Sequence, residues 1–168
     1  MSNVNPIEIE NAGLVLLAPF LPHCFRNLGF LDGMRFANEE THAKAMRLLQ
    51  FMADQEHDAK GDWSLNALLC GWPIGQPVPP FPALSAVEKA QANQVVEAMR
   101  AHWVALGDYS SDDLRRLFLR RRGLLDVGMP SILRVQPQPL DKLLRELPWI
   151  FAVTRTPWSE AIDVQWDN

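Results

Sequence analysis

The sequence lacks the features of a membrane-spanning or exported chain. Its longest apolar stretch, residues 11–25, is interrupted by Pro19 and Pro22. It offers about a dozen apolar residues, whereas a membrane-spanning helix needs about 20. Residues 1–10 contain no Lys or Arg, so they do not resemble the basic start of a signal peptide. Residues 11–25 are therefore expected to be buried inside a fold or against a partner protein, and no membrane contact is expected.

Cysteine and net charge are also low. Cys24 and Cys70 are the only cysteines, and without an export signal the pair is expected to be reduced in the cytoplasm. Whether the two form a disulfide depends on a distance that the sequence does not give. The formal net charge of -4 argues against a dedicated nucleic-acid surface, which normally carries a basic excess.

Recognisable catalytic and cofactor motifs are absent. The chain has no G-x-G-x-x-G, Walker-type or G-x-S-x-G sequence. His23, Cys24, Cys70 and His102 are zinc-type ligands, but they lack the tight paired spacing of structural zinc sites. Cys70 is expected at the C-terminal end of a helix, where a thiolate is not stabilised. We expect no catalytic residue, metal, cofactor or small-molecule substrate; a cysteine- or zinc-dependent hydrolase is the remote alternative.

Proline and tryptophan, by contrast, are abundant. The 13 prolines divide the chain into short elements. Residues 72–82, WPIGQPVPPFP, form an extended connector of the polyproline type. The six tryptophans stand against a single tyrosine, and such large rings serve either core packing or binding interfaces.

Apolar spacing and capping residues predict about five helices before residue 124. Asn11 is expected to cap the first helix, with Leu14 and Leu17 on its buried face and a kink at Pro19. The next helices are expected over residues 39–55, with an ion pair between Glu40 and Lys44, and over residues 64–70. The last two are expected over residues 85–106, opened by a capping box of Ser85 and Glu88, and from Ser110 or Ser111 to Gly123.

The period changes after residue 123. Residues 124–127 and 132–136 predict a hairpin, residues 139–147 a short helix, and residues 150–154 and 162–166 two further strands. Ile7 and Ile9 alternate with acidic residues, which favours one more short strand. The expected fold is α+β and mostly α: about five helices followed by a small antiparallel β-sheet with an inserted short helix. We expect a leader at 1–10 and one compact domain at 11–168, helical over 11–123 and sheet over 124–168.

Two groups of side chains are candidates for contact with a partner. The first is the basic run RRLFLRRR at residues 115–122, where a solvated helix face is the alternative interpretation. The second is the set of tryptophans next to prolines or in the expected sheet, where core packing is the alternative. The candidate contacts are Arg115, Arg116, Arg120, Arg121, Arg122, Trp72, Trp149 and Trp158.

Several pieces of the sequence, taken in order, resemble a known family. They are NAGLVLLAPFLPHCF, SLNALLCGWPIGQPV, AHWVAL, LRRLFLRRRG, ILRVQ, LLRELPW and the closing TPW and VQW. Together they resemble the C-terminal region of the contractile injection system tape measure protein family. The ordered set, and especially NAGLVLLAPFL followed by LNALLCG, is more specific than any single piece.

The resemblance implies a structural, non-enzymatic role in assembling a phage-tail-like contractile particle. The implied partners are other injection-system proteins (tube, sheath or baseplate components), and the implied location is the cytoplasm or the particle itself. The long region that precedes the NAGLVLL segment in full-length members is missing here, so we expect an interaction or anchoring module and not a ruler. A terminal module, a separately encoded relative and a part of a longer protein all fit. A cytosolic chaperone or adaptor for an injection-system client is the alternative function.

Overall fold

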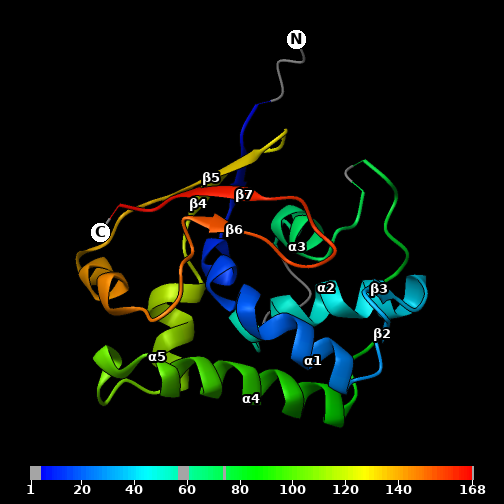
Figure 1. Ribbon diagram of the computed structural model, residues 1–168, viewed down its shortest axis with the longest axis horizontal. Coiled ribbons are helices and arrows are strands. Elements are labelled where there is room, and N and C mark those ends of the chain that lie inside the picture. The colour runs from blue at the N-terminus through cyan, green and yellow to red at the C-terminus, as the bar shows by residue number, and fades with distance from the viewer. Residues whose placement is uncertain (1–4, 57–60, 74, 168) are drawn as a thin grey trace.

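A five-stranded sheet lies along one side of a group of helices (Figure 1). The computed structural model describes residues 5–56, 61–73 and 75–167. The helical elements are η1 (Ala12–Phe20), α1 (Leu21–Asn27), α2 (Glu39–Ala53), α3 (Ser64–Leu69), α4 (Ala86–His102), η2 (Val104–Leu106), α5 (Ser111–Leu114), η3 (Arg115–Leu119) and η4 (Pro139–Glu146). The strands are β1 (Ile7–Ile9), β2 (Leu31–Asp32), β3 (Arg35–Phe36), β4 (Gly123–Asp126), β5 (Ser131–Val135), β6 (Val153–Thr154) and β7 (Ile162–Gln165).

The α+β, helix-rich fold class is confirmed. The predicted capping box of Ser85 and Glu88 opens α4, and Ser110 caps α5 in the same way with Asp113. Both boxes satisfy backbone N–H groups that have no partner within the helix. In α4, Val87 and His102 are exposed, whereas Val95 and Met99 are buried.

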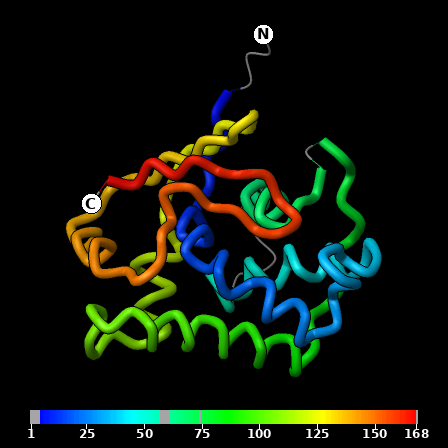
Figure 2. Tube along the Cα trace, viewed as in Figure 1, coloured from blue at the N-terminus to red at the C-terminus, as the bar shows by residue number. Residues whose placement is uncertain are grey.

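The element η1 is the centre of the molecule. Figures 1 and 2 show it with α1 between the sheet and α4, and residues 12–18 are buried on every side. The apolar stretch predicted to be covered is therefore covered by the chain itself. Leu14 and Leu17 are fully buried as expected, while Phe20 is partly buried against the same core. The expectation of a single buried face was too narrow.

Pro19 leaves a gap in η1 that another part of the chain fills. In a 3₁₀ helix the N–H of residue 19 would donate to the carbonyl of Leu16, but proline has no N–H. The indole Nε1 of Trp149 donates to this carbonyl instead, at 3.0 Å. A partner supplied from 133 residues away thus satisfies a buried acceptor next to the proline.

Asn11 does not cap the first helix, contrary to the prediction. Its side chain makes no capping hydrogen bond; its Nδ2 donates to Gln50 Oε1 at 2.7 Å and to Asn66 Oδ1 at 2.8 Å. All three side chains are buried. Because amides inside a core need partners, this cluster joins η1, α2 and α3 at one point.

The large sheet has the order β1-β4-β5-β7-β6 and is mixed rather than purely antiparallel. The predicted hairpin is confirmed as β4 and β5, but β7 runs parallel to β5. A parallel neighbour needs a long crossover, and residues 136–161, with η4 and β6, provide it. On the face toward the helices, Leu125, Leu133 and Val164 form one buried row across the strands.

Strand β1 lies within the expected leader and pairs with β4 at the sheet edge. Residues 1–4 of that leader are outside the described residues. The buried residues from Ile9 to Trp166 form one hydrophobic cluster that includes both the helical and the sheet parts. The division into a leader and a single domain at 11–168 remains a prediction.

Two local predictions were wrong. Lys44 pairs with Glu88 of α4 at 3.0 Å and not with Glu40, because α2 and α4 pack side by side. The helix expected to end at Gly123 ends earlier, since η3 is a turn of π-helix that stops at Leu119, and Gly123 opens β4. A π turn is wider than an α turn, which changes the direction in which the arginines of this segment project.

Candidate interaction surface

The basic run at residues 115–122 separates into buried and exposed arginines. Arg115 and Arg121 are only 6% and 5% exposed, whereas Arg116, Arg120 and Arg122 face solvent. The run thus spans more than one face. Of the predicted arginine contacts, only the three exposed ones can reach a partner without unfolding part of the chain.

Arg115 holds η3 against the neighbouring helices. Its Nε donates to the Met52 carbonyl at 3.0 Å, and its two Nη groups donate to Asp112 and Asn93 at 3.0 and 2.8 Å. A buried guanidinium needs such a complete set of acceptors to remain charged. The role of Arg115 in this structure is internal.

Arg121 belongs to a buried network with Asp141. The two form a bidentate ion pair at 2.6 and 2.9 Å, and the Trp166 indole and the Gln138 N–H also donate to Asp141 at 2.9 Å. Burial raises the pKa of Asp141, but the bonds from Arg121, Gln138 and Trp166 outweigh it and keep the pKa below its ordinary value. The network ties the start of β4, η4 and the end of β7 together.

The exposed arginines line a hollow of about 420 Å³, which we call the basic hollow. Its described lining is Arg116, Leu117, Arg120, Arg121, Arg122, Gln136, Gln138, Pro139 and Leu140. None of these residues carries a negative charge. The basic hollow can therefore offer charged and amide donors around a partly apolar floor.

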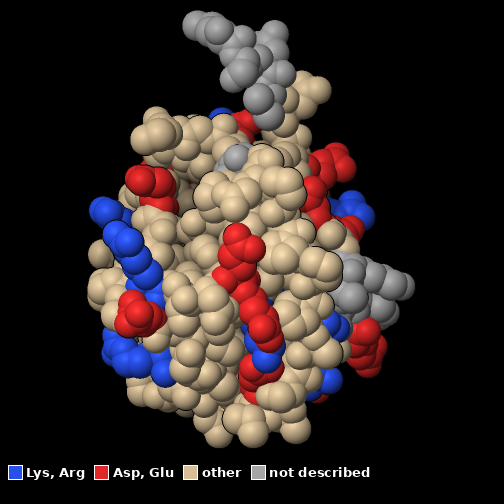
Figure 3. All heavy atoms as spheres, turned by 90° about the vertical axis from the view of Figure 1, so that its right-hand side faces the viewer, with Lys and Arg blue, Asp and Glu red and all other residues tan. Residues whose placement is uncertain are grey.

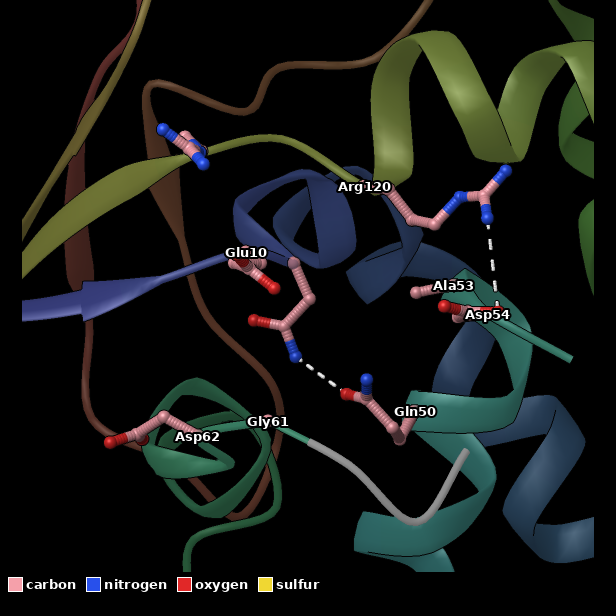
Figure 4. A pocket seen from close by; sticks show the side chains of 9 residues that line it. Glu10, Gln50, Ala53, Asp54, Gly61, Asp62 and Arg120 are labelled. Carbon is pink, nitrogen blue, oxygen red and sulfur yellow. Dashed lines mark hydrogen bonds and ion pairs between the residues drawn. The ribbon is translucent and has the colours of Figure 1, made fainter. Parts of the chain in front are cut away.

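A second hollow of about 410 Å³, the mixed hollow (Figure 4), shares Arg120 and Arg122 with the basic hollow. There Glu10, Asp54 and Asp62 share the wall with the two arginines. Arg120 points toward Asp54 at 3.8 Å, a loose ion pair. Charges of both signs already face one another here, so the mixed hollow gives no preference for either charge.

The three tryptophans predicted as partner contacts are fastened within the fold. Trp72 is 5% exposed and donates from Nε1 to the Gln76 carbonyl at 3.2 Å. Trp158 is half-buried and donates to the Leu69 carbonyl at 2.8 Å, and Trp149 is half-buried and bonded to η1 as described above. Each indole has a packing role, and a partner contact by their exposed edges remains a prediction.

The residues considered for hydrolase chemistry differ in exposure: both cysteines are buried, whereas His102 is exposed. Cys24 and Cys70 are free, buried thiols; burial raises the pKa of Cys24 to about 12 and that of Cys70 further. His102 is exposed on α4, where its Nδ1 lies 2.8 Å from the Ala98 carbonyl. Deeply buried neutral thiols are poor nucleophiles and poor metal ligands. His57, the third histidine of the chain, lies outside the described residues.

Within residues 5–56, 61–73 and 75–167, no group of three or more His, Cys, Asp or Glu residues is arranged to hold a metal ion. In the same ranges, no helix has the length and apolarity needed to cross a membrane. On the face shown in Figure 3, acidic and basic side chains alternate, and most of the surface between them is uncharged.

His42 is a structural residue that the sequence did not single out. Its imidazole is stacked on Phe36 with the ring centres 4.1 Å apart, and its Nε2 is hydrogen-bonded to the Cys70 carbonyl. The pKa of His42 is lowered because burial of the cation outweighs this bond. No motif marks such a residue, since its partners come from elsewhere in the chain.

Acid is expected to weaken the fold through His42. Because its pKa is lower in the folded than in the unfolded chain, the neutral imidazole stabilises fully above about pH 6.5, and this contribution is lost as the pH falls toward the folded pKa. His42→Ala should cost about 1–2 kcal/mol at pH 7 and reduce the dependence on pH. Urea unfolding at pH 7.5 and 5.0 measures both. An unchanged pH dependence in His42→Ala, or an equal change in the exposed control His102→Ala, would contradict the assignment.

The sequence did not reveal how the basic hollow is closed. Gln136, Gln138 and Leu140 come from the link after β5 and from η4, and they meet η3 only in the folded chain. Asp141 was likewise not recognised as the partner of Arg121, because nothing in the local sequence connects residues 20 positions apart.

One family model accounts for almost the whole chain. The model described as contractile injection system tape measure protein matches residues 2–166. Neither a curated protein nor a solved structure matches the chain.

Proposed function

Since this chain belongs to the contractile injection system tape measure protein family, we propose that it is a non-catalytic assembly module that anchors to another component of the injection particle. Membership implies an association with such components in general. The observation that carries the proposal is the family match over residues 2–166. The tube, the sheath and the baseplate are the candidate binding partners.

The location of the residues that carry the family resemblance supports a scaffold role. Pieces far apart in the sequence meet inside the fold: Asn11 bonds to Asn66, Trp149 to Leu16, Trp158 to Leu69, and Trp103 to Leu143. These pairs satisfy buried polar groups. The shared role of these pieces is therefore to stabilise one folded structure, and an assembly module needs such a fixed structure.

Dimensions favour anchoring over measuring. A folded chain of 168 residues has a radius of gyration of about 15 Å, and its described elements share one hydrophobic cluster. A length ruler has to be extended. We infer that the folded residues attach to a partner at one place in the particle, through the exposed arginines Arg116, Arg120 and Arg122.

Loss of the protein tests the proposal in the producing cell. Deletion of its gene should give few or no particles of normal length by electron microscopy, because assembly would lack one attachment. Particles that are normal in number and length after deletion would contradict an assembly role. Restoring the wild-type gene is the control.

A second measurement distinguishes the module from a chaperone or adaptor. An incorporated module should remain in gradient-purified particles at a fixed ratio to the tube protein, measured by quantitative mass spectrometry. A chaperone should be present in the cell extract but absent from the mature particle. Absence from purified particles combined with failed assembly would favour the chaperone.

A further inference from the structure

The basic hollow contains positive charge that the fold neutralises only in part. The side chains of Arg116 and Arg120 are 61% and 41% exposed, and Arg122 is exposed as well. The hollow has no carboxylate in its described lining, although the net charge of the chain is -4. The three exposed guanidinium groups therefore make this hollow locally basic, although the protein as a whole is acidic.

The carboxylates near these arginines occupy only some of the N–H donors of the guanidinium groups. Arg116 shares one 3.0 Å ion pair with Asp113 outside the hollow, and Arg120 has the loose 3.8 Å contact with Asp54. Arg122 makes no ion pair with any residue that the structure describes. A guanidinium has five N–H donors. The three arginines together can therefore still donate hydrogen bonds to several carboxylate oxygens of a partner.

The floor of the hollow is apolar and firmly supported. Leu117, Pro139 and Leu140 supply this apolar part of the lining, and Arg121, which also lines the hollow, is held by its buried ion pair with Asp141. Arg121 also donates to the Gln136 carbonyl at 2.6 Å, which fixes the adjacent wall. A rigid floor lowers the entropy cost of binding because little of the wall has to be ordered.

We propose that the basic hollow binds an acidic segment of a partner protein, with carboxylates on Arg116, Arg120 and Arg122 and an apolar side chain between them on the floor. The inference rests on the proposed function, since it names the chemistry by which the anchoring module holds its partner. Arginine is suited to this role because its planar fork matches a carboxylate in a bidentate way. The amides of Gln136 and Gln138 supply further polar contacts.

The lining favours a protein segment over a nucleic acid. A single-stranded nucleic acid is normally held by aromatic rings that stack on its bases, and the described lining contains none. Duplex binding normally requires an extended basic surface, whereas this hollow is limited to about 420 Å³. Carboxylates alternating with aliphatic side chains suit both its charge and its floor.

Binding can be measured with a defined peptide on the full chain. The probe is an N-acetylated, C-amidated peptide of sequence Glu-Leu-Glu-Glu-Leu-Glu, and the control replaces each Glu by Gln. The acidic peptide should shift NMR signals of residues 116–122 and 136–140, with at least about tenfold tighter binding than the control. Binding should weaken as salt rises from 50 to 500 mM. Equal binding of both peptides, or shifts located elsewhere, would overturn the proposal.

Matched charge reversals test the residues. Arg116→Glu/Arg122→Glu should weaken peptide binding about tenfold or more, since two attractive contacts become repulsive. Arg26→Glu/Arg155→Glu reverses two exposed arginines elsewhere and should leave binding unchanged. Both double variants should remain folded, because all four side chains are exposed; loss of the exposed Arg116–Asp113 pair should lower the melting temperature of the first only slightly. An equal loss of peptide affinity in both double variants would indicate a general charge effect and would contradict binding in the basic hollow. Tighter binding of a single-stranded oligonucleotide than of the acidic peptide would contradict it as well.

The same variants separate this inference from the proposed function. If the wild-type chain and Arg116→Glu/Arg122→Glu are both retained in purified particles, the module is an assembly component but the hollow is not its docking site. If only the charge-reversed variant is lost while it remains folded, both statements stand. If the wild-type chain is absent from particles and its deletion has no effect, the proposed function fails even where the peptide binds.

Discussion

Gly13→Ala is expected to cost about 4 kcal/mol or more of the free energy of unfolding. An added Cβ would overlap the Phe118 carbonyl oxygen and lie 2.6 Å from Leu119 Cα. Both are backbone atoms of η3, so relief requires moving one element away from another. Overpacking usually costs 1–3 kcal/mol and more where nothing can yield. Since small domains have only about 5–15 kcal/mol in total, we expect a largely unfolded variant at 37 °C.

The sign of this effect makes it a sharp test. Alanine normally stabilises a helical position by about 0.5–1 kcal/mol relative to glycine, so a small gain is expected if η1 and η3 do not approach so closely. Gly128→Ala is the matched control, because its added Cβ would lie 3.5 Å from the nearest atom, an ordinary contact. Urea unfolding and circular dichroism of both variants decide between the two outcomes.

Asp141→Ala is expected to destabilise the fold by about 3–5 kcal/mol. The change leaves the buried guanidinium of Arg121 without its counter-ion. It also leaves the Trp166 indole and the Gln138 N–H without their acceptor. Each of those losses adds to the cost because a buried donor without a partner keeps its full desolvation penalty.

The same residue gives the fold a dependence on acid. The pKa of Asp141 is lowered in the folded chain, so its contribution is complete above its unfolded pKa of about 3.9 and is lost as the pH falls through the folded value. In Asp141→Ala this part of the acid sensitivity should disappear. Asp126→Ala breaks the exposed pair with Arg134 and should cost less than about 1 kcal/mol. Equal losses in the two variants would contradict the importance given to burial.

Most of the local structure was predictable because it depends on neighbouring residues. The capping box of Ser85 and Glu88, the helix over α2 and the hairpin of β4 and β5 all follow from spacing within a few positions. Such patterns are governed by backbone hydrogen bonding and by one apolar face. The sequence therefore indicated the order of the main elements, whereas the short strands β2 and β3 were not predicted.

The errors come from contacts between distant segments. Asn11 is a residue type that commonly caps helices, but its side chain instead donates hydrogen bonds to two buried amides, Gln50 of α2 and Asn66 of α3. Lys44 prefers Glu88 to a residue on its own helix for the same reason. The parallel pairing of β7 depends on the path of the crossover, which leaves no signal in the strand itself.

The candidate surface was predictable in composition and not in geometry. The arginine run was recognised, but its division into buried and exposed side chains depends on the π turn of η3. Helical spacing assigned to an α turn places residues on other faces. Gln136, Gln138 and η4 complete the hollow. Their position depends on the path of the chain after β5, which local sequence patterns do not give.

The indole bonds described above make this protein its own set of spectroscopic probes. Trp103, Trp149, Trp158 and Trp166 each join a different pair of segments, and each indole N–H gives a separate nitrogen-correlated NMR signal. Hydrogen–deuterium exchange at these four positions would report which junction opens first during unfolding. The same signals would reveal whether an assembled particle tightens the docking of the C-terminal sheet on η1.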